Sequence, residues 1–481
     1  MGVTVESAEQ HVINLRKRMP FHFGNVVVDE GAHLFLQLSV GVDGERTDGI
    51  TQAGLEPLWF LKDPDLSMVE GIESLLEVFD AAWTAALDIG ADTAFDFWAD
   101  LYDHQRAWAA DTDHPTLFWN YGVSLVEQAV VDAVCRAHDT TFATAVRDGT
   151  LGFDPGRIYD ELADERAADL LPDEPRRSTH LRHTVGLDDP LTADEIGADE
   201  RLDDGLPQSL AAYIERDGVD RFKIKLSADV ERDMARLRDI RAVIEERCDE
   251  YAFTLDANEQ YGSATTFADQ WESLAAEPGL TAFFEKLLYV EQPLSREKAF
   301  TDEARRVLTD WDGPPVIIDE SDARPDSLGR ALDCGYAGTS HKNCKGVFAG
   351  VANRCLVEHR RRAGDGEFVI SGEDLTTIGP VELVADLATM ATIGADHVER
   401  NGHHYYRGLS MFPDDVQAAT LDAHDELYRR HEDGFATLDI EDGRIAFGSV
   451  TDAPFGRQVT PTFEAEELVP LDEWNPGSIH R

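Results

Sequence analysis

From about residue 206 onward, short apolar runs alternate with longer amphipathic segments, and this alternation constrains the fold more than any other feature. The pattern predicts helices at 207–217, 228–248, 264–277, 296–309, 326–334, 347–364 and 380–394, and strands at 221–226, 251–256, 287–291, 315–319, 337–342 and 367–371. Strands separated by helices pair in parallel, and so many units in succession favour a closed barrel. An open doubly wound sheet is the alternative, but no Gly-x-Gly-x-x-Gly opens a helix after a first strand, which argues against a dinucleotide fold.

Acidic residues end three of the predicted strands: Asp256 after Ala-Phe-Thr-Leu, Glu291 after Leu-Leu-Tyr-Val, and Asp319 after Val-Ile-Ile. Two lysine pairs flank them in the sequence, Lys223 with Lys225 and Lys342 with Lys345. The pairs are conspicuous because the chain has only eight lysines against thirty-five arginines. Since the carboxyl ends of barrel strands meet at one end of the barrel, we expect these side chains to share a site.

Three converging carboxylates without His or Cys suit a hard dication, Mg²⁺ first and Mn²⁺ as its substitute, and argue against zinc. Such a metal would hold a substrate carboxylate and stabilise the charge that develops when the α-proton leaves. Lys225 is the predicted base, and Lys223, on the same strand face, would tune it, because a neighbouring ammonium and a dication both lower the pKa of a lysine. Lys342 would face the substrate from the opposite side.

Together these motifs resemble the enolase superfamily, within the mandelate racemase and muconate-lactonizing enzyme group. The resemblance extends from about residue 20 to 410. The matching pieces are Lys223-Ile224-Lys225, Asp256-Ala257-Asn258, Glu291-Gln292-Pro293, Asp319-Glu320-Ser321, the Lys342 strand with Gly346, and the helix at 124–132 that resembles the family's link between capping domain and barrel.

The resemblance implies an α/β fold: a modified (β/α)7β TIM-type barrel with an N-terminal α+β capping domain. It implies Mg²⁺ bound by Asp256, Glu291 and Asp319, and proton abstraction next to a carboxylate through an enediolate. Lysines on both the second and the sixth strand resemble the muconate-lactonizing subgroup, whereas the mandelate racemase subgroup would place a His at 370–374, where this chain has none. The predicted enzyme is a racemase, epimerase or cycloisomerase. The alternatives are a dehydratase (lyase) of a sugar acid or related acid, and a non-catalytic barrel.

Several positions depart from the subgroup or leave alternatives open. Ser-His-Lys-Asn-Cys-Lys-Gly-Val stands where the subgroup usually has an apolar residue before the lysine and Gly-Gly after it, so Lys345 competes with Lys342 for the second acid/base role. Asn258 is predicted to orient a metal ligand or the substrate. His22, in a loop that by resemblance reaches over the barrel mouth, and Glu373 with Asp374 are predicted substrate contacts; the plain alternative for His22 is an ordinary loop histidine.

The formal net charge of -51 and the pI near 4.4 argue against nucleic acid and anionic membranes as partners. Because salt screens such self-repulsion, the composition predicts a halophilic protein from a high-salt cytoplasm. The five cysteines form no Cys-x-x-Cys pair, which is typical of a reduced, cytoplasmic chain. The sequence shows no signal peptide and no apolar run long enough to span a membrane. The expected partners are a small carboxylate substrate and, by resemblance, further copies of the chain in a dimer or octamer.

Four regions are predicted. Residues 1–150 form the α+β capping domain, with strands between about 20 and 45, a turn at Asp43-Gly44 and helices at 67–90, 92–111 and 121–137. Residues 151–205 form a connection and acidic insertion that includes the first barrel strand, at 180–185. Residues 206–415 form the barrel, and 416–481 a C-terminal segment that completes the capping domain.

Overall fold

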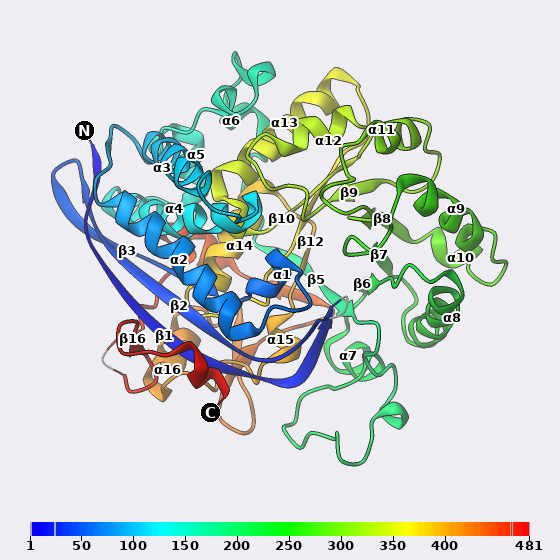
Figure 1. Ribbon diagram of the computed structural model, residues 1–481. Helices are drawn as coiled ribbons and strands as arrows, with labels where there is room; N and C mark the ends of the chain where they lie inside the picture. Colours follow the sequence, from blue (N-terminus) through cyan, green and yellow to red (C-terminus); the bar gives the residue numbers. More distant parts are fainter. Residues whose placement is uncertain (1, 24–25, 462, 464, 481) are drawn as a thin grey trace.

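The computed structural model describes residues 2–23, 26–461, 463 and 465–480. At its centre, eight parallel strands follow one another in sequence order, and the last pairs with the first, so that the sheet closes into a barrel (Figure 1). The strands are β5 (Ser178–Val185), β6 (Arg221–Lys225), β7 (Ala252–Asp256), β8 (Leu287–Glu291), β9 (Val316–Ile318), β10 (Gly338–His341), β11 (Val369–Gly372) and β12 (His397–Glu399). The predicted closed barrel is therefore confirmed, and the open sheet is excluded.

Helices cross between successive strands on the outside of the barrel (Figure 1). They are α7 (Leu210–Asp217), α8 (Val230–Arg247), α9 (Ala264–Ala275), α10 (Thr281–Phe284), α11 (Asp302–Thr309), α12 (Ser327–Asp333), α13 (Val347–Ala363) and α14 (Glu382–Ile393). Local chemistry sets where several begin: the side chains of Ser209, Asp229, Ser263 and Thr301 each accept hydrogen bonds from amides of the first turn.

The N-terminal region is an antiparallel sheet covered by helices. Its strands are β1 (Val3–Phe23), β2 (Val26–Val42), β3 (Glu45–Gly54) and β4 (Gly90–Ala91), and its helices are α1 (Pro57–Leu61), α2 (Met68–Ala86), α3 (Ala94–Ala109), α4 (Thr116–Ala137) and α5 (Phe142–Asp148). The predicted turn at Asp43-Gly44 is confirmed, with positive φ at both residues. The expectation that strands start near residue 20 was wrong, because β1 begins at Val3. A register shift between Val5 and Ser7 breaks the alternation of apolar residues there and hides the strand.

The segment between the sheet and the barrel is mostly irregular, with the short helix α6 (Ala167–Leu170) before the first barrel strand. The C-terminal segment contains α15 (Gly402–Tyr405), α16 (Asp414–Ala423), β13 (Tyr428–Arg430), β14 (Ala436–Leu438), β15 (Arg444–Ala446), α17 (Gly448–Thr451) and β16 (Val469–Pro470). It contacts both parts of the molecule, because β16 pairs with β1 and β15 pairs with β5. The four-region division stays a prediction. In the described part of the chain, no helix has both the length and the apolar character that crossing a membrane requires.

Helix α4 joins the N-terminal sheet to the barrel. Asn120 donates to the carbonyl of Lys345 at 3.0 Å, and Ser124 donates to the carbonyl of Asn343. Glu127 accepts from the amides of Val347 and Phe348, which begin α13, at 3.1 and 2.8 Å. These bonds fix the turn that follows β10.

We predict that Gly49→Ala destabilises the protein by roughly 3 kcal/mol. A Cβ on Gly49 would overlap the carbonyl of Ala129, so β3 and α4 would have to separate. The measurement is the free energy of unfolding by denaturant at fixed salt. Gly262→Ala is the matched control, because no atom lies within 4 Å of a Cβ built there. Equal stability of the two variants would contradict the close approach of β3 to α4.

Candidate functional site

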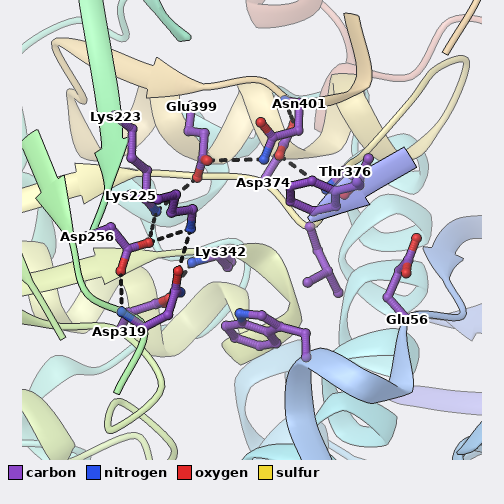
Figure 2. Close-up of a pocket in the computed structure, with 14 residues that line it drawn as sticks. Glu56, Lys223, Lys225, Asp256, Asp319, Lys342, Asp374, Thr376, Glu399 and Asn401 are labelled. Carbon is purple, nitrogen blue, oxygen red and sulfur yellow. Dashed lines mark hydrogen bonds and ion pairs between the residues drawn. The ribbon is translucent and has the colours of Figure 1, made fainter. Parts of the chain in front are cut away.

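A pocket opens at the carboxyl ends of the barrel strands, beneath residues of the N-terminal region (Figure 2). Its lining residues are Phe21, Glu56, Trp59, Lys223, Lys225, Asp256, Asn258, Asp319, Lys342, Asp374, Leu375, Thr376, Glu399 and Asn401. The cavity they leave is only about 40 Å³, far smaller than usual ligand pockets. Entry of an organic substrate therefore requires movement of the walls.

Lys223, in β6, stands at the centre of the charged groups. Its Nζ lies 2.7 Å from Glu373 Oε2 and 3.1 Å from oxygens of Asp256, Glu291 and Glu399. Burial disfavours the ammonium, but these carboxylates outweigh it and hold the pKa of Lys223 well above its usual range. Lys223 is thus a charged bridge between strand ends.

Lys225 points into the same pocket from the end of β6 (Figure 2). Its Nζ donates to Asp256 Oδ2 and to Asn258 Oδ1, both at 2.7 Å. Asn258 has a positive φ of 42°, a strained conformation that turns its side chain back over the strand end. Asn258 therefore orients Lys225. The role that the sequence analysis predicted for it, to orient a metal ligand or the substrate, stays a prediction.

Lys342 follows β10 directly and also lines the pocket, whereas Lys345 does not. Lys342 Nζ lies 2.7 Å from Asp319 Oδ1 and 2.7 Å from Glu373 Oε2, and 5.1 Å from the centre of the Trp59 ring. Lys345 Nζ donates to the backbone carbonyls of Asp319 and Ser340 at 2.8 and 2.7 Å and pairs with Asp319. This placement favours Lys342 over Lys345 as the group that can reach a substrate.

The carboxylates that approach one another most closely are Glu291, Asp319 and Glu373, with one oxygen of each within 4.8 Å of the others. The sequence analysis predicted that Asp256 belongs to this set. In the structure, Asp256 Oδ2 instead forms ion pairs with Lys223 and Lys225. Glu291 Oε2 is buried and has no hydrogen-bond partner among the described residues. Burial and the neighbouring Glu373 raise the pKa of Glu291 well above its usual range. A partnerless oxygen within an all-carboxylate set fits a hard dication.

Two consecutive acidic residues that follow β11 complete the site. Glu373 follows β11 and accepts a hydrogen bond from Arg182 at 2.6 Å. It also accepts hydrogen bonds from Lys223 and Lys342. Burial opposes its ionisation, but Lys223, Lys342 and Arg182 hold its pKa well below the usual range. Asp374 lines the pocket and accepts from the amide of Asn401 at 3.0 Å, and burial raises its pKa to about 8.

The sequence analysis predicted a loop at His22. This prediction was wrong, because the backbone of His22 lies in β1 and pairs with Val27 at the end of the β1–β2 hairpin. The side chain of His22 lies outside the described part of the structure. Its neighbour Phe21 lines the pocket, so the hairpin does reach the barrel mouth.

Sequence reasoning missed eight residues of the site: Arg182, Glu399, Phe21, Glu56, Trp59, Leu375, Thr376 and Asn401. Glu399 ends β12 as Glu291 ends β8, and this strand-end pattern could have identified it. Arg182 lies inside β5, which also contains Ser, Thr and His residues, so no apolar pattern in the sequence marks it. Phe21, Glu56 and Trp59 come from the N-terminal region, and no motif in the sequence marks them.

An ionic cluster ties α1, which carries Trp59, to the rim of the barrel. Lys62, at the end of α1, lies 2.6 Å from Glu259 and 2.5 Å from Glu320. Arg296 pairs with Glu259 at 3.2 Å and donates to the carbonyl of Phe60 at 2.7 Å. Lys62 and Glu259 both have positive φ, so the backbone is strained on both sides of the contact. The cluster holds Trp59 over Lys342.

Comparison with known proteins agrees with the barrel fold. Residues 206–426 match the family model described as enolase C-terminal domain-like. No curated protein sequence matches the chain. Among solved structures, a dipeptide epimerase from Enterococcus faecalis, complexed with Mg and the dipeptide L-Leu-L-Tyr, gives a TM-score of 0.59 at 12% identity, over 94% of this chain and 99% of that one. A muconate lactonizing enzyme from Pseudomonas fluorescens, complexed with muconolactone, gives a TM-score of 0.58 at 14% identity, over 96% and 97%.

A third structure, an enolase from Bradyrhizobium complexed with magnesium and mandelic acid, gives a TM-score of 0.56 at 14% identity, over 93% and 94% of the two chains. At these identities the structures establish the fold. The family match covers the barrel region, residues 206–426, and this region is similar to the enolase C-terminal domain-like family.

We predict that Lys62→Met lowers the free energy of unfolding by about 3 kcal/mol, because Glu320 and Glu259 lose a partner at a site with little water. Denaturant unfolding at fixed salt measures the effect. The exposed Lys298 provides the matched control, since Lys298→Met removes a lysine outside any such cluster. If Lys62→Met is as stable as Lys298→Met, the cluster does not hold α1.

Proposed function

We propose that the protein is a Mg²⁺-dependent enzyme that removes the α-proton of a small carboxylate substrate and returns a proton to the resulting enediolate. The observation that carries the proposal is the placement of Lys225 and Lys342. They come from the ends of β6 and β10, which lie four strands apart in a ring of eight, and both line one pocket. A substrate between them presents one face to each ammonium.

In this proposal Lys225 and Lys342 alternate as base and acid. The neutral lysine on one face takes the α-proton, and the C–H electron pair moves into the carboxylate to give the enediolate. The ammonium on the opposite face then donates its proton to the same carbon and inverts it. Racemisation or epimerisation is therefore the first choice. Lys223 carries its charge at the centre of the carboxylates and positions them, rather than exchanging protons with substrate.

Asp256, Glu291 and Asp319 would hold the metal, and Glu373 offers a fourth oxygen close to two of them. Bound Mg²⁺, or Mn²⁺ in its place, supplies positive charge to the substrate carboxylate as the α-proton leaves. Binding it would require Lys342 to give up its contact with Asp319, which would bring the pKa of Lys342 down towards that of a working base. The site residues thus couple metal binding to lysine activation.

The solved relatives support a carboxylate substrate, since those quoted above hold a dipeptide, muconolactone or mandelic acid. Cycloisomerisation is the second choice for the same lysines. A dehydratase acting on a sugar acid is the alternative, and Lys342 would then protonate a leaving hydroxyl. A non-catalytic barrel is disfavoured because both lysines reach the pocket. The homo-oligomeric state and the high-salt setting stay predictions from resemblance and net charge.

We expect Mg²⁺-dependent exchange of a substrate α-proton for deuterium in D₂O and concentrated salt, followed by proton NMR across amino-acid derivatives, dipeptides, sugar acids and cycloisomerase substrates. Lys225→Ala and Lys342→Ala should each lower turnover about a thousandfold. Each should also abolish exchange from one enantiomer while sparing some exchange from the other, because each base faces one side.

Lys286→Ala is the matched control, because Lys286 is exposed and lies outside the pocket. Turnover that survives in Lys225→Ala or Lys342→Ala at the level of Lys286→Ala contradicts the two-base assignment. A protein that binds no Mg²⁺ and exchanges no substrate supports the non-catalytic barrel instead.

A further inference from the structure

A cavity of about 530 Å³ lies at the opposite end of the barrel from the active-site pocket. Its walls come from residues at the amino ends of the strands: Arg176 precedes β5, Phe368 precedes β11, and Asp396 precedes β12. The outer wall is α13, through Arg354 and Arg361. No residue of the active-site pocket takes part in it. The cavity is therefore a separate space with more than ten times the free volume of the active-site pocket.

Three arginines line this cavity in a chain whose net charge is -51. Arg176 is neutralised by Asp396 and donates to the carbonyl of Gly394 at 2.9 Å. Arg354 and Arg361 share one carboxylate, that of Glu358, at 3.2 and 3.5 Å. Arg362 also pairs with Glu358, at 3.0 Å, so three guanidinium groups depend on a single anion. The α13 wall thus carries an excess of positive charge.

Arg354 is the most buried of the three arginines that share Glu358. Its side chain is 15% exposed, and among the described residues its guanidinium donates one hydrogen bond, from Nη1 to Glu358. A guanidinium has five N–H donors, so most of those on Arg354 remain free for another acceptor. Burial lowers the pKa of Arg354, which shows that its charge is incompletely compensated by the protein.

His397 adds a neutral donor to the same wall. Its Nδ1 accepts a hydrogen bond from Arg182, and a guanidinium can only donate. The ring proton must therefore lie on Nε2, which makes no hydrogen bond within the described residues. Arg182 is itself fixed by Glu373 at 2.6 Å, so the His397 ring is held in one orientation.

Glu174 also lines the cavity, and most of the remaining lining is apolar. Val357, Phe368, Ile370 and Ile393 line the cavity beside the arginines. A simple inorganic anion would leave these side chains against water, whereas an anion with an apolar body would cover them.

We propose that this cavity is a second ligand site, which binds a small organic anion. The anionic group, a carboxylate or a phosphate, binds Arg354 and Arg361, and an apolar or aromatic body lies against Phe368 and Ile370. Guanidinium groups bind both kinds of anion in a bidentate manner, so they define the charge of the ligand but not its source.

Phenyl phosphate, benzoate and inorganic phosphate are the probes, and isothermal titration of the full-length protein in EDTA and moderate salt is the measurement. EDTA removes any metal, so the result does not depend on the proposed function. We expect saturable binding of phenyl phosphate or benzoate to one site, and inorganic phosphate weaker by about tenfold because it lacks the apolar body. Arg354→Met and Arg361→Met should each weaken binding about tenfold or more.

Two control variants locate the binding. Arg306→Met, an exposed arginine on α11, should bind the probes like the wild type, and so should Lys342→Ala, which alters the active-site pocket. Circular dichroism shows whether Arg354→Met folds, and the more exposed Arg361 provides a second variant if it does not. The proposal is overturned if neither organic probe saturates a site, if both arginine variants bind like Arg306→Met, or if Lys342→Ala loses binding. Equal affinity for inorganic phosphate and phenyl phosphate overturns the apolar part of the proposal.

Discussion

The balance of buried charge at the mouth of the barrel is the interaction on which the rest of the site depends. Lys223, Lys225 and Lys342 meet the carboxylates of Asp256, Glu291, Asp319, Glu373 and Glu399, and all of them are buried. Burying charges without partners is very costly, so neither set is stable there alone. The lysines must therefore be strongly bound where they also have to react. In the proposed function, a dication bound to the same carboxylates would resolve this conflict, because it would take over part of their charge.

The N-terminal region controls access to this charged group. α4 fixes the turn after β10 that carries Lys342, and the Lys62 cluster fixes α1 with Trp59 above it. The two attachments differ in kind: α4 bonds to backbone groups of the barrel, whereas α1 is attached largely through side-chain charges at strained positions. Since the pocket is too small for a substrate as it stands, the movement that admits one is expected at α1 and the β1–β2 hairpin, with α4 staying in place.

Much of the barrel could be predicted from the sequence, because each βα unit carries its own periodicity and a charged residue ends or directly follows each functional strand. Lys225, Asp256, Asp319 and Lys342 were placed in one pocket on that basis alone. The cap residues Glu56 and Trp59 could not be found, since they reach the site through tertiary packing that no local pattern records. Glu399 was missed because β12 is only three residues long and gives almost no periodicity. The sequence alone could not distinguish Lys342 from Lys345. The structure does, because the course of the backbone directs the Lys345 side chain to carbonyl groups.

Six of the eight lysines are engaged in ion pairs with carboxylates, and only Lys286 and Lys298 are exposed. The outer surface therefore presents arginine as nearly its whole supply of positive charge, and offers very few primary amines to solvent. Amine-selective reagents would modify those two side chains first and the interior ones only when the molecule opens. The rate at which the interior lysines react with such reagents would therefore report how often the barrel mouth opens.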